Sequence, residues 1–245
     1  MAPVKRKQAM NIIVTGASRG IGYELVKLFA GDSRNTIIAV ARNTEKLARL
    51  RSECLEANPA AQVIALDCDL GDEAAVKSLA SRIQQHFSSV QVLVNNAGAI
   101  VNKPFADITL QDLQRVYTIN VFSVVSLIQQ LLPMMDPQQR THVVNISSMG
   151  GFQGSAKFAG LSAYSSSKAA VACLTECLAE EFKDKNIAFN SLALGAAQTE
   201  MLDEAFPGYK APLSAKQMAG FIASFSLTAH QYLNGKVIPV SMSNP

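Results

Sequence analysis

Apolar residues gather in short runs that alternate with longer segments along almost the whole chain. Most of these runs show little polar alternation, as strands do when a sheet is covered on both faces. The runs lie at residues 11–14, Thr36–Ala41, Gln62–Leu66, Gln91–Val94, His142–Ile146, Ile187–Leu194 and Val237–Val240. The pattern predicts a parallel sheet of about seven strands, buried between layers of helices.

The segments between these runs have the apolar spacing of three and four residues that is typical of helices. The expected helices cover a segment that opens at Gly22 and the ranges Thr44–Glu56, Asp72–Phe87, Leu110–Leu132 and Ala163–Phe182. Pro133 cannot continue a helix and ends the fourth of them. Capping residues precede apolar periodicity at Thr109-x-x-Asp112 and at Ser214-x-x-Gln217.

Repeated strand and helix units predict an α/β fold, namely a single Rossmann-fold domain with a doubly wound sheet and helices on both faces. We expect this domain over residues 10–245, because no linker or fixed-period repeat divides the chain. Residues 1–9 carry Lys5-Arg6-Lys7 without an apolar segment, which indicates a flexible tail rather than a signal or an anchor. The segment at about 200–213 is expected to be a short substrate lid.

Composition narrows the function classes. The chain has 245 residues, 49% of them hydrophobic and 17% charged, which excludes a disordered protein. A net charge of +3 without a long basic stripe argues against nucleic acid as a partner. The most apolar stretch, 119–132, is interrupted by polar residues and too short to span a bilayer, so we expect a cytoplasmic protein without membrane contact. The dispersed histidines and cysteines indicate no metal site.

The first candidate for chemistry is a glycine-rich turn that directly follows the first apolar run. It reads Thr15-Gly16-Ala17-Ser18-Arg19-Gly20-Ile21-Gly22. Strand, glycine turn and helix is the context that the dinucleotide fingerprint requires, because glycines let the backbone approach a pyrophosphate at the positive end of the helix. No Gly-Lys-Ser/Thr closes the turn, so it does not match the phosphate loop of ATPases.

The second candidate is the pair Tyr164 and Lys168. Positions i and i+4 share one face of a helix, so an ammonium group can approach the phenol oxygen. A unit charge about 4 Å away at an effective dielectric near 20 is worth roughly 4 kcal/mol. That energy would bring the phenol pKa toward neutrality, where tyrosine serves as an acid or base. A solvated lysine beside a half-buried tyrosine is the plain structural alternative.

Polar motifs also follow the later strands, where ligands gather in such folds. They read Asp67-Cys68-Asp69-Leu70, Asn95-Asn96-Ala97-Gly98, Asn145-Ile146-Ser147-Ser148 and Leu194-Gly195-Ala196-Ala197-Gln198-Thr199. Together with the glycine turn and the Tyr164-x-x-x-Lys168 pair, this ordered set closely resembles the short-chain dehydrogenase/reductase family. The resemblance runs from about Met10 to Val240.

The resemblance implies a role for each matching residue. Tyr164 would be the catalytic acid/base, Lys168 would lower its pKa and hold the nicotinamide ribose, Ser148 would bind the substrate oxygen, and Asn120 would position a water in a proton relay. The implied cofactor-binding residues are Gly16, Ser18, Arg19, Gly20, Ile21, Gly22, Arg42, Asp69, Leu70, Asn95, Ala97, Gly98, Tyr164, Lys168, Ala197 and Thr199. Structural alternatives stay open, since Asn95 and Asn96 are also suited to tying strands together and Asp69 to capping a turn.

The end of the second strand indicates the choice of cofactor. NAD-selective folds place an acid there to bind the ribose hydroxyls. Here the region reads Val40-Ala41-Arg42-Asn43, with no acid and with a guanidinium suited to phosphate. Arg19 adds a cation where NADP-preferring relatives carry one. We therefore expect NADP(H) to be preferred over NAD(H).

The expected activity is reversible hydride transfer between the nicotinamide and a carbonyl or alcohol of a small molecule. Two alternatives are a non-catalytic NADP-binding redox sensor and a same-fold isomerase or dehydratase. The resemblance implies a homodimer or homotetramer. Two departures from the family pattern bear on the site: fifteen residues separate Ser148 from Tyr164, a longer loop than usual, and Leu194 replaces the usual proline. Phe152, Phe206, Pro207 and Tyr209 are candidates for an apolar substrate wall.

Overall fold

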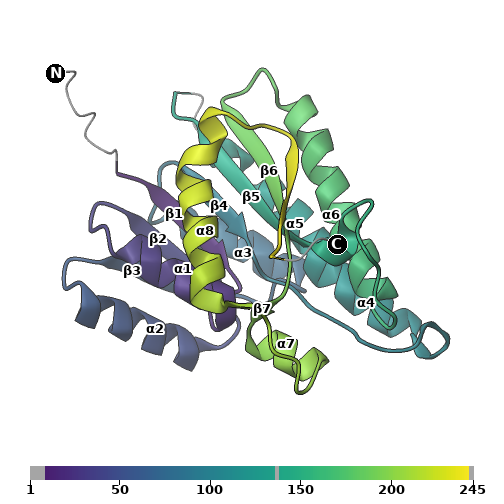
Figure 1. Cartoon of the computed structure of the whole chain (residues 1–245). Helices are drawn as coiled ribbons and strands as arrows, with labels where there is room; N and C mark the ends of the chain where they lie inside the picture. The colour runs from purple at the N-terminus through teal and green to yellow at the C-terminus, as the bar shows by residue number, and fades with distance from the viewer. Residues whose placement is uncertain (1–8, 136–137, 243–245) are drawn as a thin grey trace.

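Figure 1 shows the computed structural model, which describes residues 9–135 and 138–242. Its centre is a seven-stranded parallel sheet in the order β3-β2-β1-β4-β5-β6-β9. The strands are β1 (Asn11–Thr15), β2 (Thr36–Ala41), β3 (Gln62–Asp67), β4 (Val92–Asn95), β5 (Thr141–Ser148), β6 (Ile187–Leu194) and β9 (Lys236–Val240). The predicted sheet is confirmed. Of the predicted tail, residues 1–8 lie outside the described part of the chain.

Helices cover both faces of the sheet. They are α1 (Gly20–Ala30), α2 (Thr44–Ala57), α3 (Glu73–Gln84), α4 (Leu110–Tyr117), α5 (Ser123–Leu131), α6 (Ser162–Glu181), α7 (Glu200–Ala205) and α8 (Ala215–Thr228). One apolar core layer joins α1, α2 and α8 to the sheet, and a second layer joins α3, α5 and α6 to the opposite face. This two-layer core is the doubly wound arrangement that the uninterrupted apolar strands predicted.

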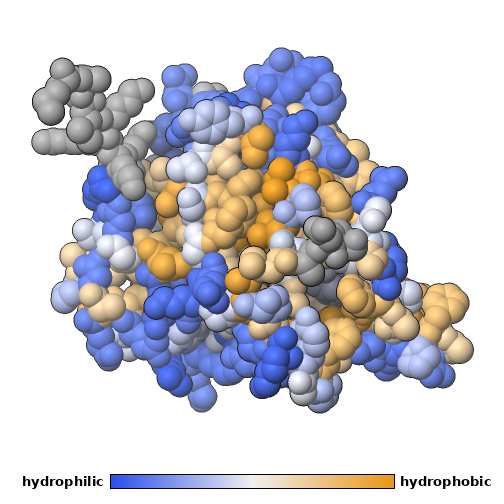
Figure 2. All heavy atoms as spheres, viewed as in Figure 1, coloured by the Kyte–Doolittle hydropathy of each residue, from blue (hydrophilic) through white to orange (hydrophobic). Residues whose placement is uncertain are grey.

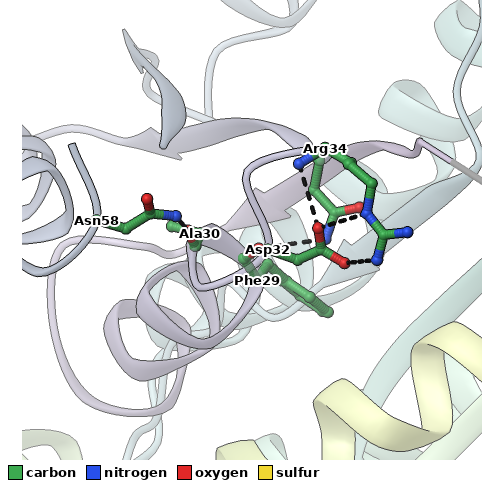
Figure 3. A network of polar contacts seen from close by, with 6 residues as sticks. Phe29, Ala30, Asp32, Arg34 and Asn58 are labelled. Atoms are coloured by element: carbon green, nitrogen blue, oxygen red, sulfur yellow. Dashed lines mark hydrogen bonds and ion pairs between the residues drawn. The ribbon is translucent and has the colours of Figure 1, made fainter. Parts of the chain in front are cut away.

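Local capping fixes where several helices begin. Both predicted capping boxes form, Thr109 with Asp112 at α4 and Ser214 with Gln217 at α8. At the C-terminal end of α1, Asn58 Nδ2 donates a hydrogen bond of 2.8 Å to the Ala30 carbonyl. The ion pair between Asp32 and Arg34 lies next to this bond (Figure 3). Helix ends leave carbonyls without intrahelical partners, and this network satisfies one of them before the chain turns into β2.

The long helix expected over 110–132 is not a continuous α-helix. A π-helical segment, Thr118–Phe122, separates α4 from α5. The run from Leu110 to Met134 is long and apolar enough to cross a membrane by composition alone, but α5 contributes Leu127, Ile128 and Leu131 to the core beneath the sheet. Packing within the domain thus accounts for the apolar residues of α5.

At both edges of the sheet, side chains leave fewer backbone groups of the edge strand open to another strand. At the β3 edge, Arg51 from α2 donates to the Val63 carbonyl and Arg82 from α3 donates to the Asp67 carbonyl, at 3.2 and 2.8 Å. At the β9 edge the Val240 carbonyl accepts from Gly195, so the alternate residue, the exposed Pro239, faces outward. Figure 2 shows apolar residues gathered in the middle of the face that α8 and β9 form.

Candidate active site

A cavity of about 1260 Å³ lies at the carboxyl ends of the parallel strands. Its wall joins the glycine turn, the ends of β2, β5 and β6, the segments that follow β3 and β4, one side of α4, the first turns of α6, and α7. Most predicted site residues lie in this wall: Gly16, Ser18, Arg19, Gly20, Ile21, Arg42, Asp69, Leu70, Ala97, Gly98, Ser148, Tyr164, Lys168, Ala197 and Thr199. Three predicted residues, Gly22, Asn95 and Asn120, lie behind it. The fold therefore collects motifs that are far apart in the sequence.

The glycine turn is shaped by positions where a side chain would not fit. Gly16 and Gly20 have φ values of +69° and +56°, in the left-handed region that favours glycine. A Cβ on Gly22 would lie 2.3 Å from the Gly16 carbonyl oxygen and 2.6 Å from Asn96 Nδ2. Gly22 thus lets α1 close against the turn, which is a packing role rather than a contact with the cavity.

The start of α1 is open toward the cavity. Its N-cap residue is Arg19, which has extended backbone and makes no side-chain capping bond, and the first turn holds no acidic residue. The first backbone N–H groups of a helix have no intrahelical acceptors, and the helix dipole adds positive potential there. This end of α1 is therefore suited to a phosphate group.

Asn95, the last residue of β4, and Asn96, which follows it, have different surroundings. Asn95 is buried in the strand, where its Nδ2 donates to Asn145 Oδ1 at 2.8 Å, and Asn145 in turn donates to Thr175. This chain of bonds ties β4 to β5 and α6, which is the structural alternative raised for the motif. Its neighbour Asn96 lies in the cavity wall and donates to the Thr15 carbonyl at 3.0 Å.

Ser148 and Tyr164 meet at the cavity wall. The Ser148 hydroxyl accepts a 3.2 Å bond from the Gly150 N–H, and Ser148 lies near enough to the Tyr164 phenol to lower its pKa. Ser147 is oriented differently, because its hydroxyl donates to the Lys168 carbonyl at 2.7 Å. The geometry therefore distinguishes the two serines and puts Ser148 beside the phenol.

Lys168 is almost fully buried, with 4% of its surface exposed. Its ammonium donates to the Ile146 carbonyl at 2.8 Å and lies 5.9 Å from the centre of the Tyr164 ring. Burial lowers the pKa of Lys168 to about 8. Burial also raises the pKa of Tyr164, against a smaller lowering by Ser148. The predicted drop of the Tyr164 pKa toward neutrality is therefore wrong, because burial has the largest effect on this phenol and the Lys168 ammonium is directed at the Ile146 carbonyl.

Asn120 lies in the π-helical segment, behind the wall and 1% exposed. Its Oδ1 accepts from the Ala99 N–H at 2.7 Å, and its Nδ2 donates to the Ala99 carbonyl and to Ser167 Oγ. A Cβ on Gly98 would lie 3.5 Å from Asn120 Oδ1 and 3.6 Å from Lys168 Nζ. Asn120 Oδ1 and Lys168 Nζ therefore both lie near Gly98, at distances where an alanine side chain would make ordinary contact with each.

Two predicted residues at the nucleotide side also make local bonds. Asp69 Oδ1 accepts from the Gly71 N–H at 3.0 Å, as a turn cap does. Thr199 is the N-cap of α7 and accepts from the Leu202 N–H at 3.2 Å. Both residues also lie in the cavity wall, so each makes a local hydrogen bond and still borders the space that a ligand would occupy.

The other side of the cavity is mainly apolar. Phe206 and Tyr209 line it as predicted, whereas Phe152 and Pro207 do not. The long loop after Ser148 adds Phe158, which is 59% exposed and which the sequence interpretation missed. Lys157 holds this loop by donating to the Phe152 carbonyl at 2.6 Å. Among the described residues, no cluster of three or more histidine, cysteine and acidic side chains is arranged for a metal.

The amino-acid sequence is similar to those of known proteins. A family model described as short chain dehydrogenase matches residues 10–210. The chain is 33% identical to a 7alpha-hydroxysteroid dehydrogenase of Escherichia coli, over 78% of this chain and 72% of that protein. It is 26% identical to an uncharacterized oxidoreductase of Staphylococcus epidermidis, over 96% of each chain.

Solved structures agree in the arrangement of the backbone. Levodione reductase superposes with a TM-score of 0.86 at 25% identity, over 96% of this chain and 97% of that one. An NADP complex of RhlG from Pseudomonas aeruginosa superposes with a TM-score of 0.84 at 27% identity, over 98% of each chain.

Proposed function

The chain belongs to the short-chain dehydrogenase/reductase family, and on that premise we propose that it transfers a hydride reversibly between NADP(H) and a carbonyl or alcohol carbon of a small molecule. One observation carries the proposal. Ser148, Tyr164 and Lys168 line the same large cavity, which the uncapped start of α1 also lines. A protein that only binds a nucleotide needs no such proton donor.

The residues present fit a nicotinamide dinucleotide. The uncapped start of α1 offers backbone N–H groups to a pyrophosphate, and the turn before it approaches closely because Gly16 and Gly20 lack side chains. Asp69 and Leu70 would border the adenosine half, and Lys168 would bind ribose hydroxyls near Tyr164. A bound dinucleotide supplies or accepts the hydride.

The protein's own residues handle the proton. In the direction of reduction, Tyr164 donates its phenol proton to the substrate oxygen as negative charge develops there. Ser148 stabilises that oxygen by a hydrogen bond that strengthens as the charge grows. The raised pKa of Tyr164 keeps the phenol protonated at neutral pH, so it is ready to act as the acid.

Lys168 and Asn120 would support the return of a proton to Tyr164. Both lie against Gly98, on the buried side of the catalytic group. With a pKa near 8, the Lys168 ammonium is close to the range where it can give up a proton. We propose that Asn120 positions a water beside it.

The preference for NADP(H) is proposed from charge. Arg42, at the end of β2, is in the cavity wall, and no salt bridge joins it to another part of the described chain. A guanidinium there is suited to the 2′-phosphate that distinguishes NADP(H) from NAD(H). Arg19 contributes a second cation from the glycine turn.

We also propose that the protein is a homodimer or homotetramer in the cytoplasm and acts on small molecules without nucleic acid or membrane contact. The apolar face over α8 and β9 is one surface that association would cover (Figure 2). Light scattering coupled to size exclusion would measure the assembly. A monomer at micromolar concentration would contradict this part of the proposal.

The test of the activity follows NADPH absorbance with purified protein over a panel of aldehydes, ketones, diketones and quinones. Tyr164→Phe should lower kcat by at least about 10²-fold with NADPH binding retained, because the proton donor is lost. Tyr232→Phe, at an exposed tyrosine, is the matched control and should leave kcat unchanged.

The same assay separates the two rival functions. Binding of NADPH with no turnover of any compound would favour a redox sensor. Conversion of a substrate with no net change in NADPH would favour an isomerase or dehydratase. Equal activity of Tyr164→Phe and the wild type would refute the proposed role of the phenol.

A further inference from the structure

Arg19 in the glycine turn already has an anionic partner. Its guanidinium forms a two-pronged contact with the Glu204 carboxylate of α7, Nη1 with Oε1 and Nη2 with Oε2, the second at 3.1 Å. The paired residues are 185 positions apart in the chain, so the contact joins the phosphate-binding turn to the lid. This is the fork geometry in which arginine binds carboxylates and phosphates most strongly.

A second carboxylate of α7 faces the same turn. Glu200 Oε2 lies 3.6 Å from the position of a Cβ on Gly20, and Thr199 is closer still. Glu200 and Glu204 are separated by one helical turn and therefore share a face. Both residues, with Arg19, line the cavity. The lid thus presents negative charge where a dinucleotide would bring its phosphates.

This arrangement sets up a competition. A 2′-phosphate that binds the Nη1 and Nη2 donors of Arg19 has to displace Glu204, because that edge of the guanidinium already holds a bidentate carboxylate. The Arg19 hydrogen bonds lower the pKa of Glu204, so the carboxylate is charged at neutral pH and repels the phosphate that replaces it. Arg42 has no such partner within the described ranges 9–135 and 138–242.

We propose that Glu204 is a specificity-determining residue, which holds Arg19 in the free protein and thereby sets how strongly the site prefers a dinucleotide with a 2′-phosphate. Displacing Glu204 also frees α7 from the turn, so binding of NADPH loosens the lid contact in a way that NADH does not. This inference rests on the proposed binding of NADP(H).

The test measures Kd for NADPH and NADH by calorimetry on the wild type and on Glu204→Gln. Removing the charge should tighten NADPH binding about threefold to fivefold, the upper part of the range for an exposed ion pair, and change NADH binding by less than about 1.5-fold. Asp203→Asn removes the same charge from the next residue, which contacts Gln198 instead of Arg19, and should leave the ratio of the two Kd values unchanged.

A double variant tests whether Glu204 acts through Arg19. In an Arg19→Gln background, Glu204→Gln should no longer shift the NADPH to NADH ratio. A shift that persists there, a shift equally large in Asp203→Asn, or equal changes for both cofactors would overturn the inference. Wild-type protein that binds neither dinucleotide would instead refute the proposed function, so the two failures are distinct.

Discussion

Replacing Lys168 by methionine should make the protein more stable while removing its activity. The wild-type ammonium is buried, and burial lowers its pKa from 10.5 to about 8. Because the folded-state pKa lies below the unfolded one, the charged lysine opposes folding at every pH below about 8. This cost is relieved as the pH rises from about 8 toward 10.5.

The size of the effect follows from these values. A difference of about 2.5 pKa units corresponds to about 3 kcal/mol. Methionine has a similar length and no charge, but it leaves the Ile146 carbonyl without its donor, at a cost of about 1 kcal/mol. We therefore expect Lys168→Met to raise the free energy of unfolding by about 2 kcal/mol at pH 7. For a domain of this size that is a Tm increase of about 4 to 8 °C.

Urea unfolding of the wild type and of Lys168→Met at pH 7 and pH 10 would measure the difference. The lysine cost should fall below about 1 kcal/mol at pH 10, so the advantage of the variant should disappear there. Lys216→Met, at an exposed lysine of α8, controls for the general effect of the substitution. A destabilised Lys168→Met at pH 7, or an advantage that is the same at both pH values, would refute the reasoning.

Two further predictions concern stability. Burial lowers the pKa of His142 to about 4, so the free energy of unfolding of the wild type should fall by up to about 3 kcal/mol between pH 6.5 and pH 4. His142→Gln should flatten this decline in acid unfolding curves. An unchanged slope in the variant would argue against the role of His142. Gly22→Ala should lower the Tm and weaken NADPH binding, because the added Cβ would lie 2.3 Å from the Gly16 carbonyl oxygen. The control is Gly220→Ala, whose Cβ would meet nothing within 4 Å. It should stabilise α8 by up to about 1 kcal/mol. Equal Tm values for the two alanine variants would contradict the packing argument.

Features that depend on neighbouring residues were predictable from the sequence. The strands β2 and β6 have the bounds that their apolar runs indicated, and both capping boxes formed, because each depends on residues within a few positions of each other. The cavity wall followed from one topological rule, that ligands gather at the carboxyl ends of parallel strands.

Features that depend on distant partners were not predictable. The family resemblance assigned Asn95 to the cofactor, with strand tying as the alternative, and nothing local in the sequence identified Asn145 on the neighbouring strand as its partner. Nothing in the sequence pairs Arg19 with Glu204. The Tyr164 pKa was misjudged because the spacing of Tyr164 and Lys168 gives no information on where the ammonium points or how deeply both groups are buried.

The two edges of the sheet have a consequence for how the protein behaves at high concentration. A bare edge strand is a template for another chain, and sheets with such edges tend to join into continuous assemblies. Here Arg51 and Arg82 bind carbonyls of β3, and Pro239 offers no N–H outward from β9. These features oppose strand addition at both ends of the sheet. Any association between copies of this chain is therefore expected to use side-chain surfaces rather than the pairing of sheet edges.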